Sequence, residues 1–148
     1  FVSLSKLWKC HEGNFMQDSE VIIHRHHDAI NEQNAESYME TIKFPFTYQN
    51  YNGISITIHN PVEYITEFDM PWDIIKKTEP NWSHSVLENL DEVARSKSSV
   101  VYKVLANRIN KLGGTDLQIQ AIWIAVFNND SWGVQFRHNL GAPIQVNC

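Results

Sequence analysis

The chain is 148 residues long, which suits one domain with a sizeable core, and 43% of its residues are hydrophobic. Its formal net charge of -5 argues against a nucleic-acid-binding surface, which needs clustered positive charge, so no nucleic-acid partner is expected. No apolar run reaches the roughly 18 residues of a membrane-spanning helix, so no membrane partner is expected either. The opening residues FVSLSKLW lack the apolar core of a signal peptide, and the expected location is the cytoplasm.

A first helix is predicted over Asp18–Gln33, within a single domain of residues 1–148 whose residues 1–15 are a candidate N-terminal arm. Its apolar residues share one stripe at helical spacing and are expected to face the core: Ile22, Ile23, Ala29 and Ile30. Asn34 is suited to cap a second, shorter helix, which Pro45 is expected to end. The second helix would turn three residues inward, namely Tyr38, Met39 and Ile42.

A hairpin and a third helix are predicted next. Asn52-Gly53 favours a tight hairpin turn, because this dipeptide readily adopts positive φ angles. The flanking strands are Thr47–Tyr51 and Ile54–Ile58. Asn60 can cap the following helix, with Glu63 placed to reach back as in a capping box. Its buried stripe is expected to be Val62, Ile65 and Phe68, and a short helical turn around Trp72–Lys77 should follow.

Long strands are predicted for the remainder of the chain. They cover Trp82–Asp91, Ser99–Asn110, Leu117–Phe127 and Trp132–Asn139. Strands of about ten residues exceed the usual five or six. Long strands after a block of helices predict an α+β fold, in which a strongly curved antiparallel sheet wraps around the N-terminal helices.

This order of elements, with the closing strand DSWGVQFR at residues 130–137, resembles the nuclear-transport-factor-2-like (NTF2-like) or SnoaL-like superfamily and its G-x-W-x-I-x-x-R ending. Three shorter stretches resemble an uncharacterised bacterial branch of it: Phe44-Pro45-Phe46, Trp82-Ser83-His84-Ser85 and Ala121-Ile122-Trp123. The resemblance covers roughly residues 17–140. It implies a cone-shaped α+β barrel whose open end admits a small ligand, and in many members a dimer through the outer sheet face.

The same resemblance leaves activity open. The superfamily includes ketosteroid isomerases, polyketide cyclases and dehydratases, but also plain binding and assembly domains. In isomerase-like members an Asp that can act as a base usually follows the second helix, whereas this chain has Phe44-Pro45-Phe46 there. The isomerase mechanism is therefore not carried over to any residue of this chain.

Three histidines lie together in the stretch His24-Arg25-His26-His27 of the first predicted helix. Two of them, three residues apart, could hold a metal ion, but a closed site needs third and fourth ligands. No metal site is expected. His26 lies at fourfold spacing from apolar residues on either side, so it should point towards the core or the edge of a pocket.

Polar side chains that interrupt apolar strands are the candidates for chemistry. His84 is expected to share a strand face with Trp82, and Tyr102 and Arg108 share a face of the next strand. In an enzyme, His84 would be the general acid or base, Tyr102 a hydroxyl partner and Arg108 an anion stabiliser. The alternatives are an outer-face or subunit-contact position for His84 and an interface ion pair for Arg108.

Aromatic side chains and one histidine are predicted to line the pocket: Trp72, Trp82, Trp123, Tyr48 and His26. In the last strand, strict alternation places Trp132, Val134 and Phe136 on one face and Arg137 on the other. There Arg137 is expected to extend to solvent or to bridge subunits.

Residues 121–127 are continuously apolar, which is typical of a strand covered on both faces. Helices would cover one face, and a second copy of the chain is the simplest cover for the other. We therefore expect a homodimer that binds a small hydrophobic organic molecule without a cofactor. Two functions remain open: cofactor-free isomerisation, cyclisation or dehydration, or a non-catalytic ligand-binding or dimerisation module.

Overall fold

The computed structural model describes residues 19–144, and the predicted N-terminal arm lies outside them. The described residues open with a helix over residues 19–32, called the first helix below. The elements that follow are α2 (Ala35–Glu40), β1 (Ile42–Asn50), β2 (Ser55–Ile58), α3 (Pro61–Glu67), α4 (Pro71–Thr78), β3 (Trp82–Arg95), β4 (Ser99–Asn110), β5 (Thr115–Asn128) and β6 (Ser131–Gly141). None of the helices in this part of the chain has the length and hydropathy needed to cross a membrane.

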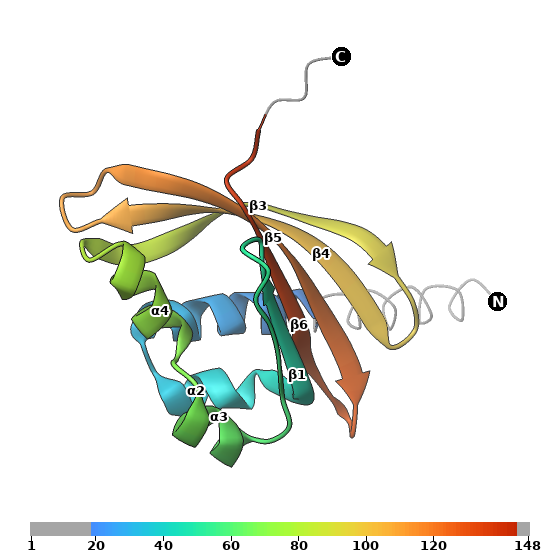
Figure 1. The fold of residues 1–148 in the computed structure, drawn as a ribbon. Helices are drawn as coiled ribbons and strands as arrows, with labels where there is room; N and C mark the ends of the chain where they lie inside the picture. Colours follow the sequence, from blue (N-terminus) through green and yellow to red (C-terminus); the bar gives the residue numbers. More distant parts are fainter. Residues whose placement is uncertain (1–18, 145–148) are drawn as a thin grey trace, which may run out of the picture.

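The fold is α+β, as predicted, with one strongly curved sheet. Its strand order is β2-β1-β6-β5-β4-β3, and the sheet bends over the helices, which all lie on one side of it (Figure 1). Strands β3 to β6 form the predicted antiparallel meander. The sheet remains unclosed, with β2 and β3 at its edges.

One strand pair departs from the predicted antiparallel sheet. Strand β1 pairs parallel with β6, whereas the other strand pairs of the sheet are antiparallel. The physical reason is that a tight turn forces its two strands to be antiparallel, whereas a long connection does not. The chain between β1 and β6 contains β2, two helices and the first three strands of the meander.

The core lies between the helices and the inner face of the sheet, the face towards the helices. The stripe predicted for the first helix is buried there, with each of its four residues at most 8% exposed. Strands β4 and β5 bury alternate residues against it: Val100, Tyr102, Val104, Ala121, Trp123 and Ala125. Asn31 fixes the helix to β3, because its side-chain amide donates to the Ser85 carbonyl and accepts from the Ser85 N–H, each at 2.8 Å.

Helix α2 is shorter than predicted. Asn34 caps it as expected, its side-chain oxygen accepting a backbone N–H at 3.1 Å. However, Ile42 begins β1, and Pro45 lies inside that strand instead of ending a helix. Pairing with β2 starts only at Phe46, and pairing with β6 is irregular between Ile42 and Thr47. The N–H that Pro45 lacks is therefore not needed for either ladder.

Helix α3 begins as predicted but buries a different face. The Asn60 side chain accepts a hydrogen bond from the Glu63 N–H at 2.8 Å. The Glu63 carboxylate accepts one from the His59 N–H at 2.9 Å. Tyr64 is the buried residue of the helix, whereas Val62 and Ile65 are 70% and 60% exposed. Counting aliphatic residues failed here because Tyr64 offers a larger apolar surface and a hydroxyl that finds a partner inside.

Candidate functional site

Two of the three predicted catalytic residues lie on the inner face of β4, far from each other. Tyr102 is 1% exposed, and its hydroxyl is 2.6 Å from the Ser19 hydroxyl. Arg108 forms a part-buried ion pair with Glu79, at the end of α4. Along a strand, their separation in sequence corresponds to about 20 Å.

The third predicted catalytic residue, His84, is exposed. A bulge between Trp82 and His84 adds one residue to β3 relative to β4, so the alternation that would place both on one face is interrupted. Trp82 is buried at 3% exposure, and its indole N–H donates to Ser85. The structure therefore does not bring the three predicted catalytic residues together.

A buried polar chain occupies the inner face instead, and it begins at Arg137 on β6. Arg137 is 7% exposed, and its Nη1 donates to Nε2 of His26 on the first helix at 2.9 Å. A guanidinium can only donate, so Nε2 accepts and the ring proton lies on Nδ1. Nδ1 donates to the Thr41 hydroxyl at 2.7 Å, which in turn donates to the Tyr38 carbonyl at 2.7 Å. This series of hydrogen bonds fixes His26 as the neutral Nδ1–H tautomer.

A β-bulge in β6 places Arg137 in this interior. Two adjacent residues of β5 pair with Val134 and Phe136, so Gln135 is an extra residue without a partner. The alternation restarts after Gln135, and Arg137 falls on the same inner face as Val134. The predicted orientation of Arg137 is therefore wrong, because strict alternation holds only in a strand without a bulge.

Aromatic rings surround the guanidinium. Its central carbon lies 5.3 Å from the ring centroid of Phe46, 5.4 Å from that of Tyr48 and 5.6 Å from that of Tyr38. Each such cation–π contact contributes about 0.5–2 kcal/mol, more when water is excluded. These contacts offset part of the cost of burying a charge.

Three of the five predicted pocket residues gather in this group. His26 and Tyr48 contact Arg137, and Trp123 meets the His26 ring edge-on, with 5.1 Å between centroids. Trp72 is one ring further out, with its centroid 5.7 Å from that of Tyr38. Trp82 is buried at the start of β3, where it contacts Ser85.

The charge state of the group follows from burial and from Arg137. Burial, and then the neighbouring charge of Arg137, lower the pKa of His26 well below its ordinary value, with His27 adding a smaller effect. Burial likewise raises the pKa of Tyr38 well above its ordinary value. At neutral pH the group therefore has one charge, the cation of Arg137.

Comparison with known proteins gives the fold a wider context. No protein-family model and no curated protein matches the chain. Solved structures do match: a cystatin-like protein of unknown function from Nostoc punctiforme (TM-score 0.65, 11% identity, 86% of this chain and 91% of that one) and an NTF2-like protein with a cystatin-like fold from Novosphingobium aromaticivorans (0.63, 10%, 94% and 88%). An NTF2-like superfamily protein from Salmonella enterica also matches (0.62, 10%, 91% and 96%). This chain has the cystatin-like fold of NTF2-like proteins.

At these identities the likeness concerns the NTF2-like fold alone. The residues around Arg137 have to be interpreted from their own geometry. Sequence reasoning missed Arg137 and Thr41 as members of this group. The available signal for Arg137 was its place at the end of the closing strand motif, but nothing in the sequence marks the bulge at Gln135.

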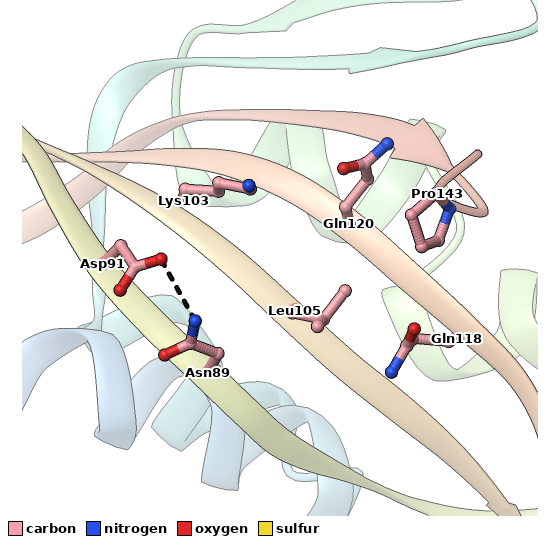
Figure 2. A pocket seen from close by; sticks show the side chains of 7 residues that line it. All are labelled: Asn89, Asp91, Lys103, Leu105, Gln118, Gln120 and Pro143. Carbon is pink, nitrogen blue, oxygen red and sulfur yellow. Dashed lines mark hydrogen bonds between the residues drawn. The ribbon is translucent and has the colours of Figure 1, made fainter. Parts of the chain in front are cut away.

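Two hollows of the described chain lie away from Arg137. One, of about 250 Å³, lies on the outer face of β3, β4 and β5, with the helices behind the sheet (Figure 2). Its lining is polar apart from Leu105 and Pro143, and Asn89 donates to Asp91 at its edge. The other, of about 540 Å³, is an open groove between α2 and α3. Neither is lined by a predicted pocket residue.

Proposed function

We propose that this chain is a non-catalytic module that binds a small organic molecule at the inner face of its sheet, beside Arg137. The observation that carries this proposal is a charged guanidinium held among aromatic rings inside the fold. An apolar residue of similar volume would fill that space at lower cost, because a buried charge loses its hydration. A bound ligand that contacts Arg137 would explain why this position has a charged residue instead of an apolar one.

The hydrogen bonds favour binding over catalysis. A general acid or base needs a nitrogen or oxygen free to exchange a proton with the substrate. Both ring nitrogens of His26 are engaged, one by Arg137 and one by Thr41. His84, the histidine predicted for that role, is exposed and hydrogen-bonded to Ser83.

A second copy of the chain is the partner we propose for the outer sheet face. Apolar residues of β5 and β6 on that face are only half-buried in the single chain: Ile122, Ile124, Val126 and Phe136. They adjoin one another through the β5–β6 pairing, in which Ile124 faces Phe136. A continuous apolar stretch of this kind is best covered by a matching surface, and a homodimer supplies one.

The test of ligand binding is a screen of small neutral, anionic and cationic organic compounds by thermal shift and native mass spectrometry. We expect some compounds to bind one per chain and to bind at least tenfold more weakly to Tyr48→Leu, whose ring faces Arg137. Tyr51→Leu, at a tyrosine that is 67% exposed, is the matched control and should bind normally. The proposal fails if no compound of any charge binds, or if both variants lose affinity equally.

A further inference from the structure

Arg137 differs from the other arginines in having no carboxylate paired with it within residues 19–144. The others each form an ion pair: Arg25 with Glu40 at 4.0 Å, Arg95 with Glu92 at 2.6 Å, and Arg108 with Glu79. Arg137 is the buried arginine, and it forms no ion pair with any residue of the described range 19–144. Within the described part of the chain, the arginine whose burial makes a counter-ion most valuable is therefore the one without a counter-ion.

The guanidinium also has donors to spare. It presents five N–H groups in a planar fork, and its bonds to His26 and to the Tyr38 hydroxyl use two of them. Thr41 accepts the Nδ1 proton of His26 and so keeps Nε2 free to accept from Arg137, which holds the guanidinium at that nitrogen. The remaining N–H groups can donate to the oxygens of a carboxylate, the acceptor that suits a guanidinium best.

A neighbouring hydroxyl pair can add a further donor. The hydroxyls of Tyr38 and Tyr64 hydrogen-bond to each other at 2.8 Å, which uses one of their two protons. The remaining proton is available to an acceptor. Because the Tyr38 ring already contacts the guanidinium, that acceptor can be an oxygen bound to Arg137.

The walls select the rest of the ligand. Rings of Phe46, Tyr48 and Trp123 favour a flat, apolar body, and a small inorganic dianion would find no solvation among them. Tyr48 is half-buried, whereas Tyr38 and Phe46 are fully buried, so Tyr48 lies on the side from which a ligand can reach Arg137. We propose that the ligand is a small monocarboxylate with an aromatic or apolar body, whose carboxylate pairs with Arg137; this inference rests on the proposed function.

Benzoate and benzamide test the inference, because they share shape and differ in charge. We expect benzoate to bind at least tenfold more tightly than benzamide by isothermal titration, with sodium sulfate as the inorganic-anion probe giving no saturable heat. Arg137→Met should lose the preference for benzoate. Arg25→Met makes the same change of charge at an exposed arginine and should keep it.

A measurement on the wild-type protein keeps the test independent of the folding of Arg137→Met. With ¹⁵N-arginine, benzoate should shift the side-chain signal of Arg137 and leave those of Arg25, Arg95 and Arg108 in place. Equal binding of benzoate and benzamide, or an unmoved Arg137 signal, would overturn the carboxylate inference while leaving the binding module intact. If neither compound binds and the wider screen is also silent, the proposed function itself fails.

Discussion

The guanidinium of Arg137 donates to Nε2 of His26 across the interior of the fold, at 2.9 Å. This bond joins the last strand to the first helix. It also keeps His26 neutral, because a protonated His26 would present a donor and a second positive charge to a guanidinium, which is a cation that can only donate. The acidity of His26 and the cost of the Arg137 charge are therefore linked.

The first prediction concerns pH. In the unfolded chain His26 takes up a proton near pH 6.5, but in the folded chain burial and Arg137 lower its pKa, so the unfolded state binds more protons below that pH. The contribution of His26 to the free energy of unfolding should be fully present above about pH 6.5. It should be lost as the pH falls below that value, by at most about 1.4 kcal/mol per pH unit for one proton. Urea unfolding between pH 5 and 8 measures this slope.

Variants separate His26 from the other histidines. His26→Gln should reduce the slope, and His24→Gln, at an exposed position of the same helix, should leave it unchanged. Part of the slope should remain in His26→Gln, because burial also lowers the pKa of His27. Identical slopes in wild type and His26→Gln would contradict the assignment.

The second prediction compares the part-buried Arg108 with the buried Arg137. Arg108→Met leaves the largely buried Glu79 carboxylate without its partner and should lower the free energy of unfolding by roughly 3 kcal/mol. Arg137→Met removes a charge that has no carboxylate partner among residues 19–144, although Nε2 of His26 loses its donor, and it should lower the free energy of unfolding by less than Arg108→Met does. Chemical denaturation at neutral pH checks both values. A loss for Arg137→Met as large as that for Arg108→Met would show that the Arg137 charge serves stability.

The third prediction concerns the attachment of the first helix to the sheet. Asn31→Ala removes two hydrogen bonds to the Ser85 backbone and leaves the Ser85 N–H without its Asn31 acceptor. We expect a loss of about 2 kcal/mol in the free energy of unfolding. Glu32→Ala, at the exposed neighbouring position, is the control and should have little effect. A negligible loss for Asn31→Ala would mean that water replaces both bonds.

The fourth prediction tests the homodimer. Ile124→Glu places a charge in the centre of the apolar stretch on the outer face and should convert a dimer to a monomer. Leu112→Glu, at a turn residue that is 98% exposed, should not. Sedimentation velocity at micromolar concentration distinguishes the two forms. A wild-type protein that sediments as a monomer would rule the dimer out.

Local sequence patterns determined most of the architecture of this protein. The caps at Asn34 and Asn60, the apolar stripe of the first helix and the long strands were all readable, because each depends on residues close together in the chain. The gathering of His26, Tyr48 and Trp123 at one place was also predicted in part, since each is an aromatic or imidazole side chain on an inward face.

Tertiary structure decided which polar residues met. One bulge turned His84 outward, another turned Arg137 inward, and β1 paired parallel to β6. A bulge is a property of two paired strands: it exists only relative to the partner's register, so one strand's residues cannot specify it. The sequence by itself thus determined the helices, the strands and the α+β class. Only the pairing of distant strands decided that the cation of Arg137 would be buried on the inner face of the sheet.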